Sequence, residues 1–259
     1  MGIVNVTPDS FSDGGFLPDA SHAIAHALRL IEEGADLLDI GGESSRPGAL
    51  PVSTEEELQR LLPVLKGLCD APIPISVDTH KPVVMRAAIA AGASMINDIN
   101  AMQTEGAWQA VAESDVAVCL MHKQGSPQTM QRDPHYHHAV REVRDFLAAR
   151  VSAAEQHGIT REKLIIDPGF GFGKRLEHNL ALLQHLDQLA TLGIPILAGL
   201  SRKSMLGKIT GRAVGQRVYA SIAAAILAAQ NGANILRVHD VAATKDAFQI
   251  IDALEKLND

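Results

Sequence analysis

Residues 75–98 read ISVDTHKPVVMRAAIAAGASMIND. Two short apolar runs, Ile75–Asp78 and Met95–Asp98, are typical of buried strands, and residues 82–91 between them have a helical period. Gly92 follows at the position where a left-handed residue commonly ends a helix. The segment is therefore predicted to be a strand–helix–strand unit with parallel strands, and each strand ends on an acidic side chain.

The same pattern recurs along the whole chain. Six further apolar runs end on a polar residue or a Gly-led turn, and segments of helical period alternate with them. Strands that alternate with helices in eight units are typical of a (β/α)8 TIM barrel, an α/β fold whose active site lies at the C-terminal ends of its strands. The six runs cover residues 3–5, 37–39, 119–122, 165–167, 196–199 and 236–240, and the expected helices cover residues 20–33, 55–69, 82–91, 106–113, 137–157, 177–190, 216–231 and 241–256.

Length and composition fit one domain of this kind over residues 1–259. No linker, charge block or low-complexity tract divides the chain, and a hydrophobic content of 46% is ordinary for a globular protein. The net charge of −7 argues against a general nucleic-acid binder, because neutralising phosphates requires a basic face. A small anionic ligand held by a local basic cluster remains compatible with this charge.

Signals for a membrane or for secretion are not found in the sequence. No apolar run reaches the roughly 18 residues that span a bilayer, and Met1–Val6 lacks the basic segment and apolar stretch of a signal peptide. Cys69 and Cys119 have no metal-binding spacing. We therefore expect reduced thiols, a cytoplasmic location and no membrane partner.

Five polar residues at strand ends are expected to converge at one mouth of the barrel. Carboxylates and amides there can read the hydrogen-bond donors of a polar heterocycle, act as acid or base groups, or bind a divalent cation. Any single one of them could instead cap a helix or tie a loop. The five residues are Asp39, Asp78, Asn97, Asp98 and Asp167.

A basic cluster follows the last two strands. Residues 199–204 read GLSRKS after the seventh strand, and Arg237 and His239 follow the eighth. Barrels often bind phosphate in these loops, with cations and helix N-termini as the binding groups. Ser201 is expected to cap the helix that follows. The long loops 7–15 and 41–48 are expected to act as lids or binding loops.

Other motifs favour structural roles. Residues 169–174, GFGFGK, lack both nucleotide-loop patterns and are interpreted as a flexible strand-to-helix turn. Two histidine sets, His22 with His26 and the three within residues 135–138, are expected to lie on the surface or to cap helices. The apolar stretch 222–229 is expected to form core or a subunit contact.

Together, these segments resemble the dihydropteroate synthases of the bacterial folate pathway over nearly the whole chain. Several motifs in the same order are more specific than any one of them. The segments that carry the resemblance are NVTPDSFSDGG (5–15), GGESSRPG (41–48), SVDT (76–79), IND (96–98), DPGFGFGK (167–174), SRKS (201–204) and RVHD (237–240).

The resemblance implies a TIM-barrel enzyme, a transferase. Members of this family join 6-hydroxymethyl-7,8-dihydropterin diphosphate to p-aminobenzoate and release pyrophosphate. The resemblance also implies Mg2+ as the cofactor, two small-molecule substrates, a p-aminobenzoate site of the kind that sulfonamides target, and a homodimer. Family members usually carry a short N-terminal hairpin below the barrel, which this sequence is expected to lack.

The resemblance assigns a role to each matching residue. The catalytic set is Asp13, Arg46, Lys203, Arg237 and His239. The pterin would be bound by Asp78, Asn97, Met121, Asp167, Phe172, Gly199, Lys203 and Arg237. The pyrophosphate would be held by Asn5, Arg46, Arg237 and His239, with Mg2+ on Asn5, and p-aminobenzoate by Phe11, Ser45, Pro47, Lys203 and Ser204 after the two long loops close.

Two departures and two alternative functions accompany this assignment. Ser45 stands where the family usually has Thr, and Lys123 stands where an apolar residue is more usual. One alternative is a pterin-binding barrel that transfers a methyl group from methyltetrahydrofolate to a corrinoid, although the DxHxxG cobalamin signature is absent. The other is a catalytically silent pterin-binding paralogue, against which the intact candidate residues argue.

Overall fold

The computed structural model describes residues 1–6 and 20–256. Its strands are β1 (Gly2–Asn5), β2 (Leu38–Gly41), β3 (Ile75–Asp78), β4 (Met95–Asp98), β5 (Ala117–Met121), β6 (Leu164–Asp167), β7 (Leu197–Ala198) and β8 (Ile235–Leu236). The helices are α1 (Ala20–Glu32), α2 (Thr54–Gly67), α3 (Pro82–Ala90), α4 (Ala107–Val111), α5 (Ala139–Gln156), α6 (Leu176–Gln184), α7 (Asp187–Ala190), α8 (Ser204–Thr210), α9 (Val218–Gln230) and α10 (Val241–Glu255).

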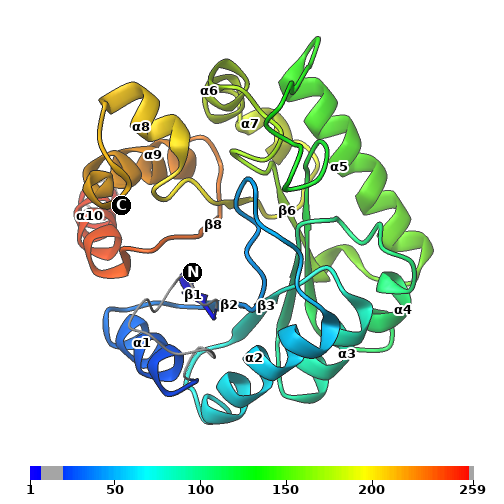
Figure 1. Ribbon diagram of the computed structural model, residues 1–259. Coiled ribbons are helices and arrows are strands. Elements are labelled where there is room, and N and C mark those ends of the chain that lie inside the picture. Colours follow the sequence, from blue (N-terminus) through cyan, green and yellow to red (C-terminus); the bar gives the residue numbers. More distant parts are fainter. Residues whose placement is uncertain (7–19, 257–259) are drawn as a thin grey trace.

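The strands follow one another around a ring, with the helices outside it (Figure 1). Strands β1 to β6 pair in sequence order in one parallel sheet, and β7 pairs with β8. Two single parallel bridges join these sheets, one between Ile166 and Ile196 and the other between Gly2 and Val238. The arrangement confirms the expected (β/α)8 TIM barrel.

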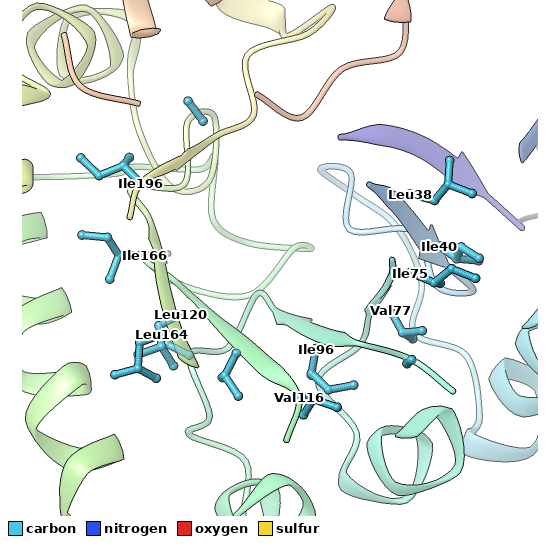
Figure 2. Close-up of a cluster of buried hydrophobic side chains, with 14 of the residues drawn as sticks. Leu38, Ile40, Ile75, Val77, Ile96, Val116, Leu120, Leu164, Ile166 and Ile196 are labelled. Atoms are coloured by element: carbon cyan, nitrogen blue, oxygen red, sulfur yellow. The ribbon is translucent and has the colours of Figure 1, made fainter. Parts of the chain in front are cut away.

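Alternation along the strands separates two apolar layers. One set of side chains faces the helices, and Figure 2 shows members of this buried cluster from successive strands, among them Leu38, Val77 and Ile166. The residues between them form a second, smaller cluster inside the ring. This inner cluster contains Met1, Met95, Cys119, Ile165 and Leu197, and it fills the barrel below the strand ends.

Helix boundaries follow the expected pattern with two exceptions. The glycines that close α1, α3 and α9 are left-handed, with φ of +93° at Gly34, +96° at Gly92 and +103° at Gly232. The helix expected over residues 177–190 is broken at His185, where neither Gly nor Pro marks the break. Helix α8 is absent from the expected helix ranges, although Ser201 was expected to cap a helix at this point.

None of the helices in the described ranges is both long and apolar enough to cross a membrane.

Candidate active site

A cavity of about 460 Å³ opens at the carboxyl ends of the strands. Its walls come from the strand ends and from the loops after β2, β6, β7 and β8, so residues far apart in sequence meet there. Most of the residues to which a role was assigned line it. These are Asn5, Ser45, Arg46, Pro47, Asp78, Phe172, Gly199, Lys203, Ser204, Arg237 and His239.

The remaining assigned residues divide into two groups. Asn97, Met121 and Asp167 are buried at the ends of β4, β5 and β6, where Asn97 pairs with Asp78 of the cavity in the strand register. Phe11 and Asp13 lie outside the described residues.

Arg237 bridges two carboxylates inside the ring. Its Nε donates to Asp39 Oδ2 at 2.5 Å, and its Nη2 donates to Asp78 Oδ2 at 3.1 Å. Burial disfavours the charge of Arg237, but Asp39 and Asp78 outweigh it and raise its pKa. Burial raises the pKa of Asp78 to about 7, Asp39 adds to the rise, and Arg237 opposes it. Asp78 is therefore expected to titrate near neutral pH.

Asp39 also fixes the amide of Asn97, whose Nδ2 donates to Asp39 Oδ2 at 3.2 Å. This bond leaves the amide oxygen Oδ1 of Asn97 as a buried acceptor without a hydrogen-bond partner among the described residues. A buried acceptor without a partner costs about 1–3 kcal/mol. A ligand that brings N–H donors to the strand ends would remove this cost.

Lys203 and Asp167 lie on the opposite side of the mouth. The Nζ of Lys203 is 4.3 Å from the centroid of the Phe172 ring, and burial lowers the pKa of Lys203 to about 8. Asp167 Oδ1 accepts a hydrogen bond from the Gly169 amide at 2.7 Å, and burial raises the pKa of Asp167. One carboxylate oxygen of Asp167 thus holds the loop.

An apolar wall completes the mouth. Phe172 and Met121 pack with Ile99 and Met130 into a separate buried cluster. Ile99 was not predicted as a site residue, although it follows Asn97 by two positions and so shares its face by strand alternation. Met130 belongs to the loop after β5 and carries no periodic signal. Such a wall fits one face of a flat ring system.

The cavity also has a strongly basic rim. Arg46, Lys203, Arg237 and His239 line it together with Arg202 and Arg217, two cations to which no role was assigned. Burial lowers the pKa of His239 to about 4, with the charges of Arg202 and Arg237 adding to the effect. A cavity with buried acceptors at its base and cations at its rim suits a donor-rich ring that carries an anionic group.

Comparison with known proteins agrees with this geometry. Residues 1–239 match the family described as pterin binding enzyme. The dihydropteroate synthase of Escherichia coli K12 is 48% identical over 254 residues, which are 98% of this chain and 90% of that protein. The chain belongs to the dihydropteroate synthase family of pterin-binding enzymes.

Solved structures of this family share the fold. The dihydropteroate synthase of Xanthomonas albilineans with 4-aminobenzoic acid is 57% identical, with a TM-score of 0.93 over 98% of this chain and 92% of that one. The same enzyme in complex with 7,8-dihydropteroate gives 54% identity and a TM-score of 0.90 over the same shares.

Two expectations drawn from the strand-end and loop patterns are wrong. Asp98 does not join the mouth, because alternation along β4 turns it away from Asn97, and its carboxylate accepts from the amides of Asn100 and Met102 at 2.6 and 2.7 Å. Ser201 does not cap α8. Its Oγ instead lies 2.9 Å from Nδ1 of His239 and accepts from the His239 amide at 3.1 Å.

The GFGFGK turn is pinned rather than loose. Lys174 is buried, and its Nζ donates to the carbonyl oxygens of Gly169 and Phe172 at 2.9 and 3.1 Å. Gly169 and Gly173 have φ of +66° and +61°, and a Cβ on either would overlap neighbouring backbone. The turn therefore presents Phe172 to the mouth in a fixed position.

A second cavity of about 230 Å³ lies on the other side of the loop after β2, residues 42–53. The tip of this loop crosses to the loop after β5, where the Gly48 amide donates to the Pro127 carbonyl at 3.0 Å. The base of the loop is held by Lys81, whose Nζ donates to Glu43 and Glu57 at 2.6 Å each. Lys123, one of the two departures, lines this second cavity and not the first.

Two of the histidines outside the site, His137 and His138, lie on the surface as expected. The amides of His137 and His138 donate to Glu142 Oε1 at 2.8 and 2.7 Å at the start of α5, and both side chains are exposed. In the described part of the chain, no group of three or more His, Cys, Asp or Glu side chains is placed to hold a metal ion.

Proposed function

We propose that this protein is a dihydropteroate synthase that condenses 6-hydroxymethyl-7,8-dihydropterin diphosphate with p-aminobenzoate. The products are 7,8-dihydropteroate and pyrophosphate. The observation that carries the proposal is one cavity with buried acceptors at its base and a basic rim, in a chain whose full-length relatives are dihydropteroate synthases.

The base of the cavity suits the pterin ring. A pterin presents ring N–H and amino donors, and Asn97 Oδ1, Asp78 and Asp167 supply acceptors. We expect Asp78 to exchange its bond to Arg237 for bonds to the ring, whereas Asp39 keeps Arg237 in place through its own bond. Met121 and Phe172 would pack on the ring, beside Gly199, Lys203 and Arg237.

The basic rim suits the leaving group. Arg46, Arg237 and His239, with Asn5, would hold the two phosphates and stabilise the charge that develops as the bond breaks. Mg2+ fits here as an ion held mainly by the pyrophosphate, because it binds through few protein groups and keeps several waters. Asn5 offers it one amide oxygen. When bound, it would neutralise negative charge on the leaving group.

The reaction exchanges one bond for another. The C–O bond to the diphosphate breaks, and its electron pair leaves with pyrophosphate. The amine nitrogen of p-aminobenzoate forms the new C–N bond with its lone pair and then loses a proton to solvent. A strong base is not required, because an arylamine is neutral at pH 7. Asp13 is our candidate for stabilising positive charge on the pterin as the C–O bond breaks.

The second substrate would bind at the outer part of the cavity. Ser45, Pro47, Lys203 and Ser204 line that region, and Phe11 is assigned to the same site. The loop after β2, which carries Ser45 and Pro47, already crosses the mouth, so p-aminobenzoate would enter between this loop and α8 after the pterin is bound.

Location and assembly belong to the same proposal. Two free cysteines, one exposed and one buried, support a reducing, cytoplasmic location. Exposed apolar side chains on the packed helices α9 and α10 support a homodimer through that face. They are Tyr219, Leu227 and Ile250.

A direct assay tests the proposed activity. The purified protein should form 7,8-dihydropteroate and pyrophosphate in equal amounts from the two substrates. Absence of product would contradict the proposal, and methyl transfer from methyltetrahydrofolate to a corrinoid would favour the alternative enzyme.

A further inference from the structure

Arg202 adopts a backbone conformation that non-glycine residues rarely adopt. Its φ is +57°. In the described part of the chain, the other non-glycine residues with a positive φ are Ala101 and Met102. Such strain persists only where the surroundings over-determine it, and it is concentrated at functional sites. Arg202 lies between Ser201, which contacts His239, and Lys203, which lies over Phe172.

Three neighbours hold Arg202 in this conformation. Its amide donates to Ser221 Oγ at 2.9 Å, and its guanidinium donates to Asp240 through Nε at 3.0 Å and Nη2 at 2.5 Å. Its carbonyl accepts from Nη1 of Arg217 at 3.1 Å, and the same Nη1 lies 3.5 Å from the Lys203 carbonyl. Backbone and side chain are thus both fixed from α9 and from the loop after β8.

Arg217 reaches these carbonyls by lying against α8, which packs beside α9 (Figure 1). Its Nε donates to the Arg212 carbonyl at 2.9 Å, and it forms no ion pair with any described residue. Gly207 on α8 leaves the space for the guanidinium. A Cβ there would lie 2.6 Å from Nε and closer still to Cζ and Nη2.

We propose that Arg217, seated on Gly207, is a positioning residue that fixes the Arg202–Lys203 peptide. This holds Lys203 over Phe172 while Ser201, on the other side of Arg202, holds His239, so both side chains face the same cavity. Arg217 acts through backbone carbonyls and need not touch substrate. The inference rests on the proposed function, because Lys203 is assigned to both substrates.

Gly207→Ala tests the proposal without threatening the fold. The three atoms nearest to the added Cβ all belong to the end of the flexible Arg217 side chain, and Ala is favoured over Gly inside a helix. The melting temperature should therefore not fall. The KM for each substrate should rise, and kcat/KM should fall about 10- to 100-fold, because small misplacements of a positioned group have effects of this size. A partly unfolded enzyme would lower kcat alone.

Gly215→Ala is the matched control, since a Cβ at Gly215 meets open space. It should leave both kinetic constants unchanged. Adding Gly207→Ala to Arg217→Ala should cause no further loss, because the overlapping guanidinium is gone. A further loss in the double variant, or an unchanged kcat/KM in Gly207→Ala, would overturn the proposal.

A crystal structure of unliganded Gly207→Ala gives a readout that does not depend on activity. Arg217 should leave the Arg202 carbonyl, and Lys203 should leave the Phe172 ring. Unchanged positions of Arg217 and Lys203 would contradict the positioning role of Arg217. An inactive wild-type protein would instead contradict the proposed function.

Discussion

Arg237 and Asp78 are joined across the barrel mouth, where Nη2 donates to the carboxylate at 3.1 Å. The same carboxylate is assigned to the pterin, and we expect ligand binding to exchange this bond for bonds to the ring. Asp39 retains Arg237 during the exchange, since its bond to Nε is separate. We therefore expect Asp39 to hold the cation while Asp78 is released to the ligand.

This relationship predicts a pH dependence of pterin binding. Burial raises the pKa of Asp78 to about 7, and the ring needs the ionised acceptor. As pH rises through 7, the ionised fraction grows, so affinity for a pterin analogue should rise several-fold between pH 6 and pH 7.5. Above pH 8 it should fall as Lys203, with a pKa of about 8, loses its proton.

Calorimetric titrations at several pH values measure this profile. Asp78→Asn should bind more weakly and lose the rise between pH 6 and pH 7.5. The same rise in Asp78→Asn and in the wild-type protein would assign the titration to another group.

Asp167 should be required for pterin affinity. Asp167→Asn replaces a charged acceptor by an amide, whose NH2 group would face the N–H donors of the pterin. We therefore expect binding of a pterin analogue to weaken by about 2–4 kcal/mol. Titration calorimetry measures the change. Asp187→Asn is the control, because it removes the same charge from an exposed position on α7. Equal affinities of the Asp167→Asn and wild-type proteins would place the pterin elsewhere.

Removal of the metal should stop the reaction but not unfold the protein. Excess EDTA should abolish product formation and leave the circular dichroism spectrum unchanged, because the leaving group loses its neutralising ion. Added Mg2+ should restore activity. Full activity in metal-free buffer would show that no cation acts with Asn5 on the pyrophosphate.

How far the sequence alone predicts the site depends on alternation along the strands. Asn97 and Asp98 are adjacent, and only a fixed register decides which of them faces the mouth. The run of apolar residues around them is buried on both faces and does not reveal that register. The eight strand ends, in contrast, follow from a pattern that recurs throughout the chain.

Side-chain partners from distant loops were harder to predict. Ser201 precedes a helix, which favours a cap, yet the helix begins at Ser204 and the hydroxyl contacts His239. Arg217 lies in a turn after α8 and carries no motif. Its contact with Gly207 depends on how α8 and α9 pack, which no local pattern in the sequence records.

A substitution at Pro47 should separate inhibitor from substrate. Sulfonamides mimic p-aminobenzoate and project beyond the volume of its carboxylate, so a changed rim should affect them more. Pro47 lines the cavity on the loop after β2. For Pro47→Ser we expect the sulfonamide inhibition constant to rise by a larger factor than the KM for p-aminobenzoate. An equal rise in both constants would show that Pro47 does not lie where the sulfonamide projects beyond p-aminobenzoate.

A crystal structure with bound 6-hydroxymethyl-7,8-dihydropterin diphosphate tests the central claim most directly. We predict that the ring lies within hydrogen-bond distance of Asp78, Asn97 and Asp167, that the bond between Arg237 and Asp78 is broken, and that the phosphates contact Arg46 and His239. A ring in the second cavity beside Lys123, or an intact bond between Arg237 and Asp78 with the ligand bound, would contradict the account.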